Sequence, residues 1–248
     1  MIANELKAEK QDHSHWRLRL ETHNPNGSTE VDEVVESGQG DLKKPILMNG
    51  HPLTAEQRRK ADARIQQLVR DPGPLRKSRQ QEDQDTARSQ RLLKMLPDAF
   101  TYKYGERRGD LVQLNFAPNP KFHPSTHEAE VFHAMEGSLW VDSKQLRVEE
   151  IAGRLTREVK FAGGLLGHLD QGGTFDVKQA PVAPGYWELT ALQVQMKGKA
   201  LFFKTIGVHQ YYTRSDFKRV SDDLPVAKAA EMLKDQTLSA QSQTGAKQ

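Results

Sequence analysis

The residues with the clearest potential for metal chemistry lie between positions 123 and 133. His123, His127 and His133 are close together in the chain, and Glu128 and Glu130 lie among them. Two histidines four residues apart can bind zinc when both lie on one face of a helix. A proline between the first two histidines disfavours such a helix, and HEAEVFH does not have the spacing of HExxH. We therefore predict an exposed loop and helix start here, with a hydrolase or metalloenzyme using His123 and His127 as an alternative.

The other histidine, glycine, serine and carboxylate motifs do not indicate a catalytic site either. His13 and His15 share one face of a strand, but no third metal ligand accompanies them. The glycine-rich segment 162–167 precedes a strand, whereas a phosphate-binding loop precedes a helix, so we interpret it as a β-bend packed beneath the sheet. No serine has the GxSxG context, and Glu149 and Glu150 face opposite ways on a strand. We predict no catalytic residue, no metal site and no cofactor.

Composition excludes several classes of protein. The 248 residues include no cysteine, which excludes disulfides, thiol catalysis and zinc–thiolate sites. The net charge is +3, and the most basic segment, 58–91, has no aromatic residue, so we expect no nucleic-acid binding. No apolar run is long enough to span a membrane. The N-terminal residues lack the apolar core of a signal peptide, so either the protein is cytoplasmic or the sequence starts after a removed signal.

The stretch from Met135 to Phe161 carries the strongest structural pattern. Leu139 and Val141 alternate with polar residues, Asp142-Ser143-Lys144 is a turn signal, and a second strand follows. A period of two predicts strands with one buried and one solvent-facing surface. This stretch therefore predicts two strands and the start of a third.

Two helices are predicted to interrupt the strands. Thr54 and Gln57 have the spacing of a capping box, and apolar residues follow at helical spacing. A second helical segment runs from about Leu75 to Leu96, and its charged middle, 75–91, is expected to be solvated. We predict a flexible or helical N-terminus at 1–12, a single domain at 13–220 with a helical insertion at 54–96, and a short helix followed by a disordered tail at 221–248.

The expected fold class is mainly β with helices (α+β). We expect a strongly curved antiparallel sheet of about ten strands, an incomplete β-barrel, with the helical insertion covering one face. A curved sheet with few covering helices leaves an apolar concave surface that can bind a hydrophobic ligand. The aromatic residues predicted to line that surface are Trp140, Phe161, Phe175 and Phe202.

Three segments carry a resemblance to known proteins. MEGSLWVDSKQLRVEEIAGRL, VKFAGGLLGHLDQGGTFDV and WELTALQVQMKGKALFFKTI resemble uncharacterised envelope proteins of soil bacteria such as acidobacteria. The strand G-x-L-W-V-D, followed by a charged strand, is also similar to the lipoprotein-carrier superfamily of LolA-like and LolB-like proteins. The insertion at 54–96 departs from that superfamily, and no residue here matches the carriers' lid-fixing arginine.

This resemblance implies an exported, periplasmic protein without catalytic activity or a cofactor. It also implies a half-barrel whose concave face holds a lipid or a lipoprotein acyl chain. The alternative is an interaction or scaffold module whose charged segment, 75–91, binds an envelope protein partner.

Overall fold

The computed structural model describes residues 1–200 and 204–234. Its thirteen strands pair antiparallel in a sheet that does not close, and helices accompany them, so the predicted α+β class is confirmed. The strands outnumber the ten or so that the sequence predicts, because short strands such as β4 (His51–Pro52) and β10 (Gly167–Leu169) carry little alternation to detect.

The chain forms two compact units. Unit 1 contains Met1–Asp12 and Ala87–Tyr212, and unit 2 contains His13–Thr86 and the C-terminal part from Thr213. This division differs from the single domain predicted over 13–220. The tail predicted to be disordered lies largely outside the described residues, and a helix is present at 226–234.

Unit 2 begins with an antiparallel meander. Its strands are β1 (His15–His23), β2 (Thr29–Val35), β3 (Leu42–Met48) and β4, in the order β4-β3-β2-β1. The last part of β13 (Lys204–Val220) belongs to this unit and lies beside β1. The first fifty residues thus form the meander that their turn signals predict.

Helices cover the buried face of this meander. The predicted capping box begins α2 (Ala55–Arg70): the Thr54 hydroxyl accepts from the Gln57 N–H at 3.2 Å, and the Gln57 side chain accepts from the Thr54 N–H at 2.8 Å. Ile65 of α2 and Leu75 at the start of α3 (Gly73–Ala99) enter one core with Val35 and Leu42. The helix at 226–234 adds Val226, Ala229, Ala230 and Leu233 to it.

Unit 1 contains six strands of eight or more residues. They are β5 (Phe100–Arg108), β6 (Leu111–Pro118), β7 (Met135–Asp142), β8 (Arg147–Leu155), β11 (Thr174–Ala183) and β12 (Tyr186–Ala200). Their order is β5-β6-β7-β8-β11-β12, with the first part of β13 beside β12. Two short strands, β9 (Val159–Phe161) and β10, pair with each other, and β10 also pairs with β12. The Met135–Phe161 stretch therefore forms β7, β8 and β9, as predicted.

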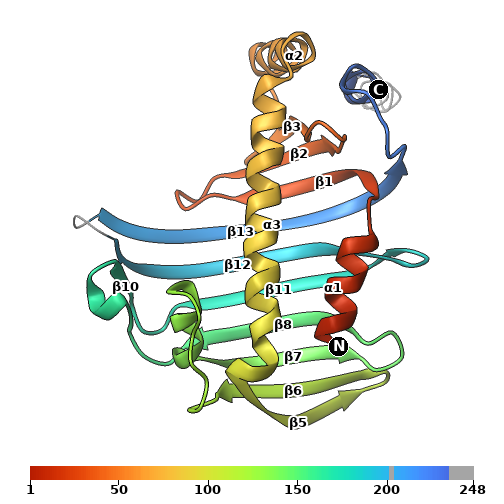
Figure 1. The fold of residues 1–248 in the computed structure, drawn as a ribbon. Coiled ribbons are helices and arrows are strands. Elements are labelled where there is room, and N and C mark those ends of the chain that lie inside the picture. The colour runs from red at the N-terminus through yellow and green to blue at the C-terminus, as the bar shows by residue number, and fades with distance from the viewer. Residues whose placement is uncertain (201–203, 235–248) are drawn as a thin grey trace. The chain divides into compact units, whose positions relative to one another are not determined.

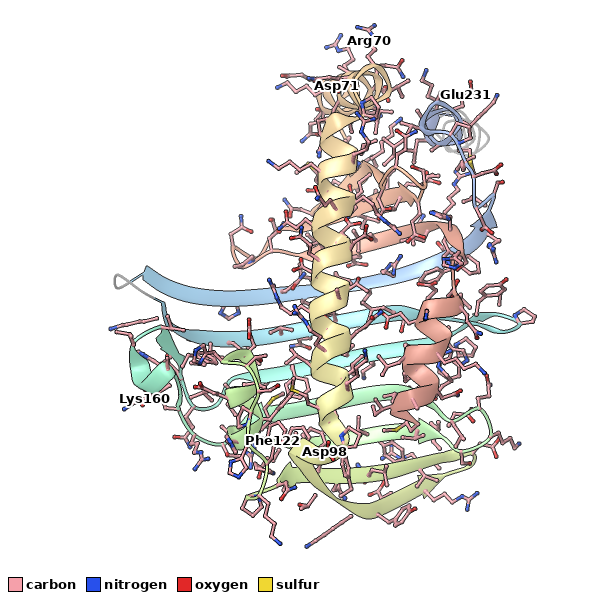
Figure 2. All side chains as sticks on the ribbon, viewed as in Figure 1. Arg70, Asp71, Asp98, Phe122, Lys160 and Glu231 are labelled. Atoms are coloured by element: carbon pink, nitrogen blue, oxygen red, sulfur yellow. The ribbon has the colours of Figure 1, made fainter. Side chains whose placement is uncertain are left out.

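Helices cover one face of this sheet. Figure 1 shows α1 (Ile2–Gln11) and the part of α3 after residue 86 on the same side of the strands. The core beneath them joins Ile2, Leu96, Phe100 and Phe132 to strand residues, and the Phe100 and Phe116 ring centroids are 4.7 Å apart. Phe132 comes from the short helix η1 (Glu128–Ala134), near Phe122, which is labelled in Figure 2. The N-terminus is therefore helical and is anchored by burial of Ile2.

Helix α3 is continuous from Gly73 to Ala99. Leu75 is buried in unit 2, Leu96 is buried in unit 1, and most side chains from 76 to 91 are exposed. The sequence predicts a solvated segment at 75–91, whereas the structure buries Leu75 at its start.

Candidate functional site

The two faces of the unit 1 sheet differ sharply in polarity. Strand register places apolar side chains in two rows that cross β6, β7, β8, β11 and β12 on the helix-covered face. The first row is Phe116, Gly137, Gly153, Phe175 and Val194, and the second is Leu114, Leu139, Ile151, Val177 and Leu192. A sheet that is apolar on one face and polar on the other buries the apolar face against helices or a ligand.

Paired glycines let aromatic rings lie directly on the sheet. Gly137 pairs with Gly153 across β7 and β8. A Cβ atom on Gly137 would lie 2.8 Å from Phe116 Cζ, and a Cβ atom on Gly153 would lie 2.7 Å from Phe175 Cζ. Since real Cβ atoms do not approach other carbon atoms so closely, only glycine allows both rings to occupy these positions.

Burial decreases from Phe116 onward along the first apolar row and from Leu139 onward along the second. At the β6–β7 end, Phe116 is 4% exposed and Leu139 is 2% exposed. The members of the two rows that lie on β8, β11 and β12 are only half-buried. We call these residues the apolar strip: Ile151, Phe175, Val177, Leu192 and Val194. The strip continues the rows of the core, but its side chains remain partly exposed to solvent. It is therefore the part of this face that a ligand can contact.

One end of the apolar strip is bounded by a polar cluster that fixes α1. A Glu5 carboxylate oxygen accepts from the Arg147 guanidinium at 2.9 Å and from the Val148 N–H at 2.6 Å, while the other oxygen accepts from the Gln179 amide at 3.1 Å. The Arg147 guanidinium also lies 5.3 Å from the centroid of the Trp187 ring. This cluster is the only extensive charged contact that we find between α1 and the strands among the described residues.

The other end of the strip is apolar. Leu155 and Val159 are buried there, with Phe161 and Met196 packed against them. The strip therefore has an apolar end and a polar end, at which the charges of Glu5 and Arg147 are already paired.

The predicted lining residues do not lie together. Phe175 belongs to the apolar strip, Phe161 packs at its apolar end, and Phe202 lies outside the described residues. Trp140 pairs with Glu150 on the opposite face, where the Arg108 guanidinium lies 4.3 Å from its ring centroid. Alternation shows which residues share a face within one strand, but register between strands determines the common surface. The alternating Phe175 and Val177, and Leu192 and Val194, were the sequence signal for the strip.

The opposite face of the sheet is polar. One row on it consists of Asn115, Ser138, Ala152, Asp176 and Gln193. An open depression of about 560 Å³ lies over its small residues Ser138 and Ala152. Beside it the Arg154 guanidinium donates twice to Glu136, at 2.8 and 2.9 Å, so the charges at its edge are paired. Paired charges and shallow relief are typical of a solvent-facing sheet surface.

The histidines do not gather around a common point. His127 Nδ1 lies 2.8 Å from a Glu130 carboxylate oxygen, and His123 is exposed. Within residues 1–200 and 204–234, no group of three or more His, Cys, Asp or Glu residues is arranged to hold a metal ion. In the same residues, no helix is long and apolar enough to cross a membrane.

Comparison with known proteins found no matching protein-family model, no matching curated protein and no matching solved structure. The resemblance to lipoprotein carriers therefore remains a prediction.

Proposed function

We propose that this protein is a non-enzymatic binding protein that holds a hydrophobic molecule, such as a lipid acyl chain, on the apolar strip. The observation that carries this proposal is the decline in burial along the two apolar rows. The rows that are buried at Phe116 and Leu139 continue onto β8, β11 and β12 as half-buried side chains. A ligand that covered them would extend the core across the sheet.

Burial of hydrocarbon supplies the free energy for such binding. Each methylene removed from water contributes about 0.8 kcal/mol, so a chain that covers only part of the strip still gains several kcal/mol. An apolar ligand also needs no partner for a hydrogen bond on this surface. The paired charges of Glu5 and Arg147 limit the strip at one end, so the bound hydrocarbon chain would end there.

The arrangement agrees with the implications of the carrier resemblance. Those proteins also combine an antiparallel sheet with helices on its apolar face. On this basis we propose an exported, periplasmic protein and a lipid or lipoprotein acyl chain as the ligand class. This proposal is supported by the α+β fold class and by the apolar strip.

Binding is tested with a matched pair of variants in β12. Leu192 lies in the apolar strip, and the adjacent Gln193 faces the polar side. Purified protein is titrated with a fluorescent fatty acid and analysed by native mass spectrometry for copurified lipid. We expect Leu192→Ser to weaken binding about tenfold, while Gln193→Ser has little effect. Equal affinities, or no binding by the wild-type protein, would contradict the proposal.

A second candidate function rests on helix α3. Most side chains between 76 and 91 are exposed although both ends of the helix are docked. This charged segment, 75–91, is the predicted surface for an envelope protein partner. Variants in which Lys77 and Arg91 are changed to glutamate would lose such a partner in a pull-down without unfolding, whereas an unchanged set of partners would argue against this function.

A further inference from the structure

Two adjacent leucines are exposed at the turn between β9 and β10. Leu165 is 75% exposed and Leu166 is 38% exposed. We call residues 162–167 the leucine loop. The sequence predicts that this segment packs beneath the sheet, and the structure contradicts that prediction. Single exposed leucines are common on protein surfaces, but two neighbouring ones at a loop tip form a small apolar surface with no cover in the described residues.

The backbone holds the leucine loop in this conformation. Ala162 has a φ of 49° and the next two residues, Gly163 and Gly164, have φ of 65° and 97°. The Ala162 N–H donates to a Glu130 carboxylate oxygen at 3.2 Å, and the Leu166 N–H donates to the Phe161 carbonyl at 3.2 Å. A left-handed alanine is unfavourable, so the surrounding contacts maintain a conformation that presents the leucines outward.

Basic residues lie in a row at the foot of the loop. Register places Lys160, which is labelled in Figure 2, opposite His168, and His168 opposite Lys199. Both lysines are exposed. Glu158 lies on the same face but two residues farther from the loop, with a carboxylate oxygen 3.9 Å from the Lys160 ammonium. Lys160 and Lys199 therefore stand at the foot of the loop, where the Glu130 carboxylate binds the Ala162 N–H and an Asp170 carboxylate oxygen lies 3.3 Å from the His168 ring.

We propose that the leucine loop docks this protein on the surface of an anionic lipid bilayer. Leu165 and Leu166 enter the boundary between headgroups and acyl chains, and Lys160 and Lys199 contact lipid phosphates. An apolar loop tip with flanking lysines suits such a surface. The leucine side chains insert among the lipids, and the lysine ammonium groups are attracted to the lipid phosphates. The inference does not depend on the ligand bound by the apolar strip.

Vesicle sedimentation tests the apolar part of this surface. The full chain is mixed with vesicles of phosphatidylglycerol and phosphatidylcholine in equal parts. We expect the double variant Leu165→Ser/Leu166→Ser to partition at least about tenfold more weakly than the wild-type protein. The control is Leu146→Ser, because Leu146 is also exposed, at 50%, but lies in the β7–β8 turn. It should sediment like the wild-type protein.

The charged part is tested with Lys160→Gln/Lys199→Gln. This variant should bind vesicles containing phosphatidylglycerol about tenfold more weakly and pure phosphatidylcholine vesicles no differently. Equal thermal unfolding of all variants shows that folding is retained. The proposal is overturned if the wild-type protein does not sediment with anionic vesicles, or if the leucine variant sediments equally well. Cross-linking of the loop to another protein instead would assign this surface to a protein partner.

Discussion

Glu5 and Arg147 form an ion pair in which both side chains are nearly excluded from solvent, at 12% and 13% exposure. The pair joins the N-terminal helix α1 to the start of β8, although Glu5 and Arg147 are 142 positions apart in the sequence. The buried Glu5 carboxylate is stabilised by three hydrogen-bond donors: the Arg147 guanidinium, the Val148 N–H and the Gln179 amide.

Removal of Glu5 should destabilise unit 1 strongly. Glu5→Ala leaves the Arg147 charge buried without its counter-ion, which costs about 3 kcal/mol. Urea unfolding measures the change in the free energy of unfolding. Glu136→Ala is the control, because its partner Arg154 is 67% exposed and such pairs contribute less than about 1 kcal/mol. Equal losses in the two variants would show that burial of the Glu5 pair is unimportant.

Gly137 should not tolerate a side chain. A Cβ atom there would lie 2.0 Å from the Ala152 carbonyl oxygen, so β7 and β8 would have to separate locally. We expect Gly137→Ala to lower the free energy of unfolding by about 3 kcal/mol, at the upper end of the cost of overpacking. Gly38→Ala is the control, because nothing lies within 4 Å of its Cβ position. It should change stability by less than about 0.5 kcal/mol.

Asp32 should make the stability of unit 2 depend on pH. Burial raises the pKa of this carboxyl from 3.8 to about 7, and Glu30 adds to the rise while Lys43 and Arg64 oppose it. The folded state therefore binds a proton that the unfolded state releases above pH 4. Stability should consequently decrease as pH rises from about 4 to about 7, and Asp32→Asn should flatten this part of the profile.

Urea midpoints collected between pH 4 and pH 8 check the Asp32 prediction. Glu56→Gln serves as the control, since Glu56 is an exposed residue at the start of α2 that pairs with Lys60. Its profile should follow that of the wild-type protein. A wild-type profile that rises over this range would contradict the predicted direction.

Arg108 should shield Trp140 from solvent. The guanidinium covers the indole ring at 4.3 Å, and Trp140 is only 7% exposed on a face that no helix in the described part of the chain covers. Arg108→Ala should increase acrylamide quenching of tryptophan fluorescence and cost about 0.5–1 kcal/mol. Arg107→Ala is the control, because Arg107 pairs with Val112 and points to the other face. Quenching that is unchanged in Arg108→Ala would show that the arginine does not cover the ring.

The sequence by itself determined the local features of this protein. Alternation in Leu139 and Val141 predicted β7, and the spacing of Thr54 and Gln57 predicted the start of α2, because these signals depend on neighbours within a few residues. The α+β class followed from the number of such strands.

Tertiary structure decided which residues form a surface. Trp140 and Phe175 both belong to alternating strands, yet register places them on opposite faces, and register depends on turns and bulges between distant segments. Contacts across the fold likewise expose Leu165 and bury Leu75, because burial depends on which elements lie nearby and not on the hydrophobicity of the side chain alone.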